Sequence, residues 1–203
     1  MRVPLAELPL DELLHAARGC THCSEHLPLG PNPIVRASEH CEVVLVSQAP
    51  GRIAHLSGVP YQDPSGRRLR EWLDVTEEEF YESGVFAILP MGFCFPGKRG
   101  RGDAPPRPEC APLWHEHFWR ALPQVRLKVL LGAYAQNAYL PDTAHKTLTE
   151  RVRHHAELWP EWLPLPHPSP LNTPWLKRNP WFEREVLPKL RHAVREGALA
   201  RTG

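Results

Sequence analysis

Four short apolar runs, each bordered by segments with helical patterning, constrain the fold of this chain most strongly. The runs span residues 42–47, 85–89, 127–132 and 162–165. Runs of this length are typical of strands that are buried on both faces of a sheet. Strands that alternate with helices favour a parallel arrangement, because each crossover returns the chain to the same edge. The sequence therefore predicts an α/β fold with a mostly parallel sheet.

The segments between these runs carry recognisable helix signals. Thr76-Glu-Glu-Glu79 has the residues of a capping box, which begins a helix. Residues 94–110 are rich in Gly, Pro and Arg, and we expect a long loop there. Helices are expected over residues 4–18, 65–73, 108–122 and 179–196, with one more from Ala133.

Length and composition narrow the class of protein. The chain has 203 residues, and its 24 Lys and Arg against 23 Asp and Glu leave a net charge of 24 − 23 = +1. That length suits a single domain over 1–203, and the near-neutral charge argues against a general polyanion binder while allowing a local basic patch. No apolar run approaches the ~18 residues of a membrane helix. The first 17 residues are amphipathic rather than a signal peptide, and five cysteines are few for a disulfide scaffold. We expect a cytoplasmic monomer with reduced thiols or a metal site, and no membrane partner.

Two motifs follow strands of the predicted sheet, at the edge where α/β proteins bind ligands. They are the turn Ser47-Gln-Ala-Pro-Gly51 and the loop His167-Pro-Ser-Pro-Leu171. Together with Gly58-Val-Pro-Tyr61 they resemble the uracil-DNA glycosylase superfamily, over a span from about Cys20 to Leu190. The resemblance implies a three-layer α/β/α sandwich around a short, mostly parallel four-stranded sheet.

The cysteine spacing adds to the resemblance. Cys20 and Cys23 form a C-x2-C pair, and 15 residues separate Cys94 from Cys110. This arrangement resembles the iron–sulfur branch, family four, in which four thiolates hold a [4Fe–4S] cluster. Residues 1–30 and 94–110 would then form one cysteine site. Zinc or free thiols are the alternative, since C-x2-C also suits zinc. Cys41 directly precedes a strand, and we interpret it as a small buried apolar residue.

The resemblance also implies roles for residues of the motifs. The activity would be excision of a deaminated base, uracil or a related base, from DNA by hydrolysis of the N-glycosidic bond in base excision repair. His167 would donate a hydrogen bond to the departing base, and Gln48 would hold a water molecule. Tyr61 would stack on the flipped base, unless it is a half-buried core tyrosine. Ala49, Gly51 and Pro90 would complete the base pocket.

Other residues are expected to contact the DNA itself. Ser169 and its loop would grip phosphates, and Leu171 would fill the vacated stack as an apolar wedge. Lys177 and Arg178 would face the minor groove. A basic run in the cysteine loop could add an electrostatic footprint or could be a solvated surface; its members are Lys98, Arg99, Arg101 and Arg107.

Two positions depart from the family pattern. Gln48 stands where family four has Glu, and a neutral amide cannot act as a general base. Pro90 stands where the superfamily has an Asn that reads the edge of uracil. These departures leave a second hypothesis open, a damage-binding relative with weak or absent catalysis. A third is a small redox or zinc protein in which the His-Pro-Ser-Pro loop is coincidental.

Overall fold

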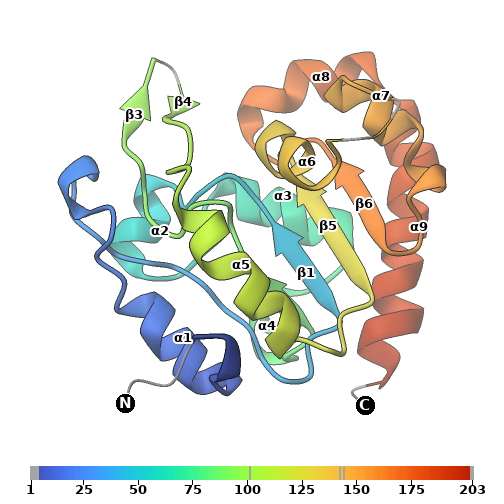
Figure 1. Ribbon diagram of the computed structural model, residues 1–203. Helices are drawn as coiled ribbons and strands as arrows, with labels where there is room; N and C mark the ends of the chain where they lie inside the picture. The colour runs from blue at the N-terminus through green and yellow to red at the C-terminus, as the bar shows by residue number, and fades with distance from the viewer. Residues whose placement is uncertain (1–4, 101, 142, 144, 202–203) are drawn as a thin grey trace.

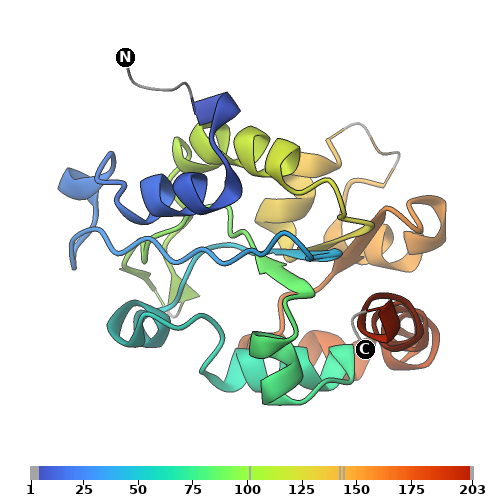
Figure 2. The ribbon, with the colours of Figure 1, turned by 90° about the horizontal axis from the view of Figure 1, so that it is seen from below.

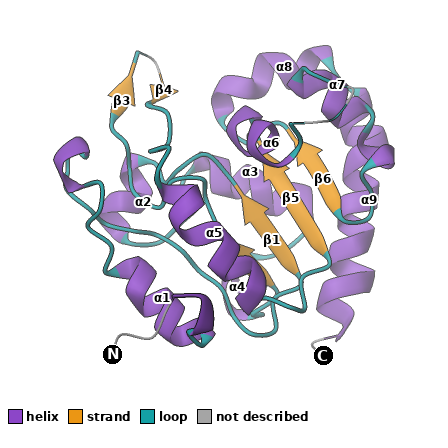
Figure 3. Cartoon of the chain, viewed as in Figure 1, coloured by secondary structure: helices purple, strands orange, loops and turns teal. Residues whose placement is uncertain are grey.

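The computed structural model describes residues 5–100, 102–141, 143 and 145–201. Four strands form its main sheet, in the order β2-β1-β5-β6, and every neighbouring pair is parallel (Figures 1 and 3). The predicted α/β fold with a parallel four-stranded sheet is confirmed. Because every pair is parallel, all four carboxyl ends lie at one edge of the sheet. The arrows of β1, β5 and β6 point to this edge, toward the top of Figure 1. The strands are β1 (Val43–Val46), β2 (Phe86–Ile88), β5 (Leu127–Leu131) and β6 (Trp162–Leu165).

Helices cover both faces of this sheet, which makes three layers (Figure 2). Successive strand side chains point to opposite faces, so Val44 and Val46 join one buried cluster while Val43 and Leu45 join the other. The first cluster includes residues of α1 (Leu10–Arg18), α5 (Cys110–Ala121) and α6 (Ala133–Tyr139). The second includes residues of α3 (Pro64–Leu73), α4 (Glu77–Glu82), α7 (Leu148–Arg153) and α9 (Leu187–His192).

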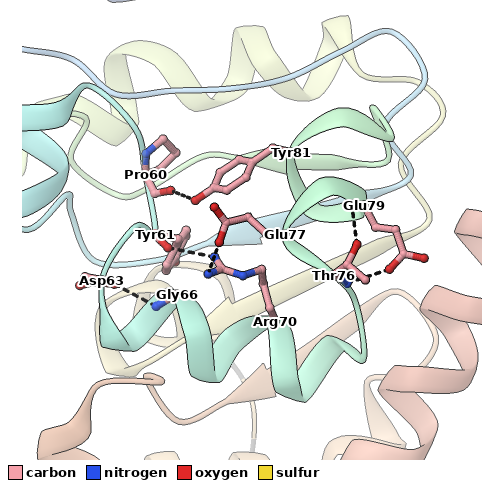
Figure 4. A network of polar contacts seen from close by, with 9 residues as sticks. All are labelled: Pro60, Tyr61, Asp63, Gly66, Arg70, Thr76, Glu77, Glu79 and Tyr81. Atoms are coloured by element: carbon pink, nitrogen blue, oxygen red, sulfur yellow. Dashed lines mark hydrogen bonds and ion pairs between the residues drawn. The ribbon is translucent and has the colours of Figure 1, made fainter.

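Helix starts follow local hydrogen-bonding rules. The Thr76 hydroxyl accepts from the Glu79 backbone N–H at 3.0 Å, and the Glu79 carboxylate accepts from the Thr76 N–H at 2.7 Å. This capping box confirms the predicted start of α4. Asp63 caps α3 in the same way, because its Oδ1 accepts from the Gly66 N–H at 2.9 Å (Figure 4).

Two expectations of local structure were wrong. The N-terminal segment is not one helix: a 3₁₀ turn at Leu5–Glu7 ends before Pro9, and α1 starts at Leu10. Proline disfavours helical geometry at the residue before it, which separates the two elements. The cysteine loop is also not irregular throughout, because β3 (Lys98–Arg99) and β4 (Gly102–Asp103) pair as a short antiparallel hairpin.

The closing helical segment is wound unevenly. It runs from Phe182–Val186 as a π-helix through α9 to a second π-helical stretch at Ala193–Ala198. Pro188 lacks an N–H to donate, and a π-type turn next to it removes the need for one. Among the described residues, no helix combines the length and apolar character that crossing a membrane requires. The remaining short helices are α2 (Arg52–Ser57), α8 (Thr173–Arg178), Ser24–His26, His155–Glu157, Pro170–Asn172 and Leu199–Arg201.

Candidate functional site

A pocket of about 450 Å³ opens at the carboxyl edge of the sheet. It lies where the turn after β1, the segment before α3, the hairpin β3–β4 and the loop after β6 meet. Parallel strands bring these connections to one edge although they are far apart in sequence. The structure thus brings together the predicted base-pocket residues with the predicted phosphate and wedge residues, namely Gln48, Ala49, Gly51, Tyr61, Pro90, His167, Ser169 and Leu171.

His167 has a defined protonation state in this pocket. Burial lowers its pKa, so the imidazole is neutral near pH 7, although the carboxylates of Asp63 and Asp103 act in the opposite direction. Its Nδ1 accepts a hydrogen bond from the Ser169 backbone N–H at 3.2 Å. A neutral imidazole that accepts at Nδ1 carries its proton on Nε2. His167 therefore offers one N–H donor at Nε2.

The loop that carries His167 is fixed from behind. Arg68 of α3 donates to the carbonyl oxygens of Pro168 at 3.4 Å and Ser169 at 3.0 Å, and to the Thr173 hydroxyl at 3.2 Å. The Asn172 side-chain amide donates to the His167 carbonyl at 2.8 Å. Within the loop, the Asn172 backbone N–H also donates to the Ser169 carbonyl at 2.9 Å. Together these bonds hold the imidazole on a well-supported loop.

Gln48 connects two parts of the pocket wall. Its Nε2 donates to the carbonyl oxygen of Ala104 at 2.8 Å, directly after β4. The amide group thus ties the turn after β1 to the hairpin. This bond uses one of the two amide hydrogens, so Oε1 and the second hydrogen remain for a water molecule. The structure thus gives Gln48 a tethering contact that the sequence did not indicate.

Tyr61 occupies an unusual backbone conformation. Its φ is +63°, in the left-handed region that non-glycine residues rarely adopt. Arg70 supports this conformation by donating to the Tyr61 carbonyl at 3.1 Å (Figure 4). The ring packs edge-on against Phe80 with centroids 6.1 Å apart, and burial raises the pKa of its hydroxyl. Tyr61 is thus partly a core residue and partly a pocket wall, a combination of the two interpretations made from the sequence.

Two carboxylates in the pocket were missed by the sequence analysis. Asp63 caps α3 with Oδ1, while Asp103 of β4 pairs with Lys98 of β3 through a contact of 2.6 Å from Nζ to Oδ1. Neither belongs to a motif. The position of Asp103 depends on the hairpin and on the tether from Gln48, so no local signal in the sequence identifies it.

The four predicted metal ligands converge on a second, smaller site. Cys20, Cys23, Cys94 and Cys110 line one cavity of about 20 Å³, and all are free thiols. Burial raises the pKa of Cys94 to about 11 and that of Cys110 to about 12. The Phe93 backbone N–H donates to the Cys110 Sγ at 3.3 Å, as amides around metal-bound thiolates do. Four partly buried cysteines around one cavity fit a metal or cluster bound by cysteine alone.

Cys41 lies elsewhere, as expected. It is 1% exposed and packs in the cluster between the sheet and α1 and α5. It does not line the cavity of the other four. Burial raises its pKa to about 11, which is the behaviour of an inert core thiol.

The predicted basic run is mostly engaged within the protein. Arg107 pairs with Glu109 at 2.6 Å and lies beside Cys23, so it belongs to the cysteine site. Lys98 is held by Asp103, and Arg101 lies outside the described residues. Arg99 is exposed on the hairpin, and Lys177 and Arg178 are exposed on α8, but these three do not line the pocket. The hairpin and α8 both stand at the pocket end of the molecule (Figure 1).

One further group of possible metal ligands occurs among the described residues. His145, His154 and Glu157 offer ligand atoms within 4.8 Å of one another. However, the two imidazole rings are stacked at 3.8 Å with an interplanar angle of 7°, and His145 Nε2 contacts Glu157 at 3.0 Å. The lone pairs of stacked rings lie in separate parallel planes, so we interpret this group as a stacked, hydrogen-bonded cluster rather than a convergent site.

Comparison with known proteins adds the family. A solution NMR structure from Methanosarcina acetivorans, described as a "putative Uracil DNA glycosylase", is similar over 77% of this chain and 94% of that chain, with 15% identity and a TM-score of 0.46. The model of the uracil DNA glycosylase superfamily matches residues 35–191, which include the turn after β1 and the loop after β6. Because this match covers well over half of the sequence, the chain belongs to the uracil DNA glycosylase superfamily.

Proposed function

We propose that this protein is a DNA glycosylase that excises a deaminated base, uracil or a related one, by hydrolysis of the N-glycosidic bond in base excision repair. The observation that carries the proposal is the neutral imidazole of His167, which lines the same pocket as Tyr61 and the turn after β1. A volume of about 450 Å³ is within the usual range for a small-molecule site.

The chemistry needs a donor where negative charge develops. As the glycosidic bond breaks, the base leaves as an anion and the sugar gains oxocarbenium character. The Nε2–H of His167 would donate to a carbonyl oxygen of the base, and this bond strengthens as charge accumulates. A neutral donor suits this task because it leaves the base as an anion without first protonating it.

Reaching the pocket requires extrusion of the nucleotide from the duplex. Leu171, at the end of the loop that carries His167, is 65% exposed and lines the pocket. An apolar side chain in that place would fill the gap left in the stack. Lys177, Arg178 and Arg99 would contact phosphates around the pocket, which makes DNA the proposed partner.

The base preference is left open by the pocket wall at the end of β2. Pro90 has no side-chain donor, and its carbonyl oxygen already accepts from His115 Nε2 at 2.9 Å. The next amide, on Met91, donates to the Ser47 carbonyl at 2.8 Å. Because these backbone groups are occupied, they give no reason to single out uracil among deaminated bases. Uracil, hypoxanthine and xanthine should therefore be compared side by side.

We also propose that Cys20, Cys23, Cys94 and Cys110 hold a [4Fe–4S] cluster, as in the family four branch. Among the described residues, no three cysteine sulfurs lie within 4.8 Å of one another. A single zinc ion would draw them to about 3.8 Å, given Zn–S bonds of about 2.3 Å, whereas a cubane cluster accepts wider spacing. When bound, the cluster would supply a cross-link between the N-terminal segment and the 94–110 loop. Zinc is the alternative occupant.

The decisive experiment is single-turnover excision from DNA that carries uracil, hypoxanthine or xanthine, in single- and double-stranded form. We expect the wild type to release at least one base, and His167→Ala to lower the rate by ~10²–10³. Gln48→Ala should lower the rate less, because a neutral amide can position water but cannot act as a general base. Binding of damaged duplex without release of any base would instead favour the second candidate, a damage-binding relative, which the neutral Gln48 allows.

A further inference from the structure

We infer that Asp103, on the hairpin of the cysteine loop, is the carboxylate that accepts the proton of the attacking water. The inference rests on the proposed glycosylase function and adds a catalytic residue from a segment outside both strand-end motifs. It would replace the acid that is absent at position 48.

The geometry leaves one oxygen of Asp103 available. Lys98 faces Asp103 across the hairpin, and its Nζ lies 2.6 Å from Oδ1. Oδ2 points to the turn after β1, because a methyl group on Gly51 would lie only 3.6 Å from it. Among the described residues, no donor is bonded to Oδ2. The ion pair therefore holds the carboxylate in place while its second oxygen faces the pocket.

The other polar groups of the pocket are less suited to accept a proton. The Gln48 amide cannot act as a base, and one of its two N–H groups donates to the Ala104 carbonyl. The Nδ1 lone pair of His167 already accepts from Ser169, and Nε2 carries the proton. Asp63 is engaged in capping α3, because its Oδ1 accepts from the Gly66 N–H at 2.9 Å.

The position of Asp103 relative to the turn is fixed by Gln48. The bond from Gln48 Nε2 to the Ala104 carbonyl anchors the residue next to Asp103, and the Ala104 N–H in turn donates to the Gly97 carbonyl at 2.9 Å. Gln48 is thus a positioning residue. Removal of the Gln48 side chain would therefore slow the reaction by displacing Asp103.

In the proposed step, Asp103 Oδ2 takes one proton from water as the water oxygen bonds to C1′ of the sugar. The C1′–N bond breaks, and its electron pair goes to the base, which the His167 N–H stabilises as an anion. The anion then takes up the proton from Asp103, directly or through solvent. The net reaction adds one water molecule across the glycosidic bond and needs no oxidant or reductant.

The test compares Asp103→Asn with Asp63→Asn in single-turnover excision of the base that the wild type removes most rapidly. Asn keeps the shape of either side chain, and it also caps helices well, so α3 keeps its start in Asp63→Asn. We expect Asp103→Asn to lower the rate ~10²-fold or more and Asp63→Asn to lower it less than tenfold.

Two further measurements separate catalysis from structure. Asp103→Asn should bind a duplex with an abasic-site analogue within about threefold of the wild type, and added formate should restore part of the rate to Asp103→Ala. Three outcomes would overturn the role of Asp103 and leave the proposed function intact. They are equal rates for the wild type and Asp103→Asn, equal reductions in both Asn variants, and no rescue by formate. Absence of any excision by the wild type would overturn the proposed function, and this inference with it.

Discussion

A methyl group on Gly66 would lie 1.7 Å from the carbonyl oxygen of Tyr61. The first turn of α3 thus packs directly against the backbone of the residue that forms one wall of the pocket. Arg70, one turn later on the same helix, donates to that same carbonyl (Figure 4). Glycine at position 66 and the left-handed conformation of Tyr61 are two parts of one arrangement.

We therefore expect Gly66→Ala to displace Tyr61 and to destabilise the fold by about 1–3 kcal/mol, the usual range for overpacking. Urea denaturation would measure the decrease in stability, and excision assays the effect on the pocket. Gly19→Ala is the matched control, since a methyl group there makes only ordinary contacts, the nearest at 3.5 Å. Equal stability of the two variants would contradict the steric argument.

Gln48→Glu should weaken the protein, although it restores the residue of the family four pattern. The carboxylate would face the Ala104 carbonyl, which now accepts from the Gln48 amide at 2.8 Å, and two acceptors repel. We expect a loss of excision at least as large as in Gln48→Ala, measured in single turnover at neutral pH. An increase in rate would show that an acid at position 48 can act directly.

Removal of any one of the four clustered cysteines should remove the bound metal. We expect Cys20→Ser and Cys110→Ser to lose visible absorbance and most of the iron measured by elemental analysis. Cys41→Ala should keep both, because Cys41 lies apart from the cavity. If the wild type contained zinc and showed no visible absorbance, the bound metal would be zinc and not the cluster.

Stability should fall in acid because of His115. Its burial lowers its pKa to about 4, so between the unfolded value of about 6.5 and 4 the unfolded state binds the extra proton. Stability is therefore fully present above pH 6.5 and falls as the pH drops toward 4, by about 1.4 kcal/mol per pH unit from this group. Urea titrations at pH 7, 6 and 5 would measure the slope. His115→Phe should be less stable at pH 7 and less sensitive to acid, and an unchanged slope would exclude His115 as the source.

Lys177 and Arg178 should contribute to DNA affinity without affecting the chemistry. We expect the double change to Ala to weaken binding. It should also reduce the slope of log K against log salt by about one for each phosphate that the protein no longer neutralises. Arg126→Ala is the control: this exposed residue precedes β5, at the opposite edge of the sheet, and pairs with Glu42 at 3.5 Å. Fluorescence anisotropy at several salt concentrations would measure both. If the slope of log K against log salt were the same in the wild type and the double variant, Lys177 and Arg178 would not contact the DNA.

Several structural features of this protein could be predicted from local sequence. The apolar runs gave the four strands, the Thr76 capping box gave the start of α4, and the spacing of the cysteines indicated four residues that line one cavity. These features depend on neighbours within a few residues, or on repeated chemistry, so they can be recognised without a fold. The strand-end rule also brought Gln48 and His167 to the same edge of the sheet.

Other features depended on contacts between distant segments. The role of Gln48 as a tether comes from a bond across 56 positions to Ala104, and Asp103 enters the pocket only because that tether and the hairpin place it there. Arg107 turned from a predicted DNA contact into a partner of Glu109 and Cys23 for the same reason. The sequence shows that these charged and polar residues are present. Their partners depend on the loops that the parallel sheet brings together at one edge, and only the tertiary structure shows which loops these are.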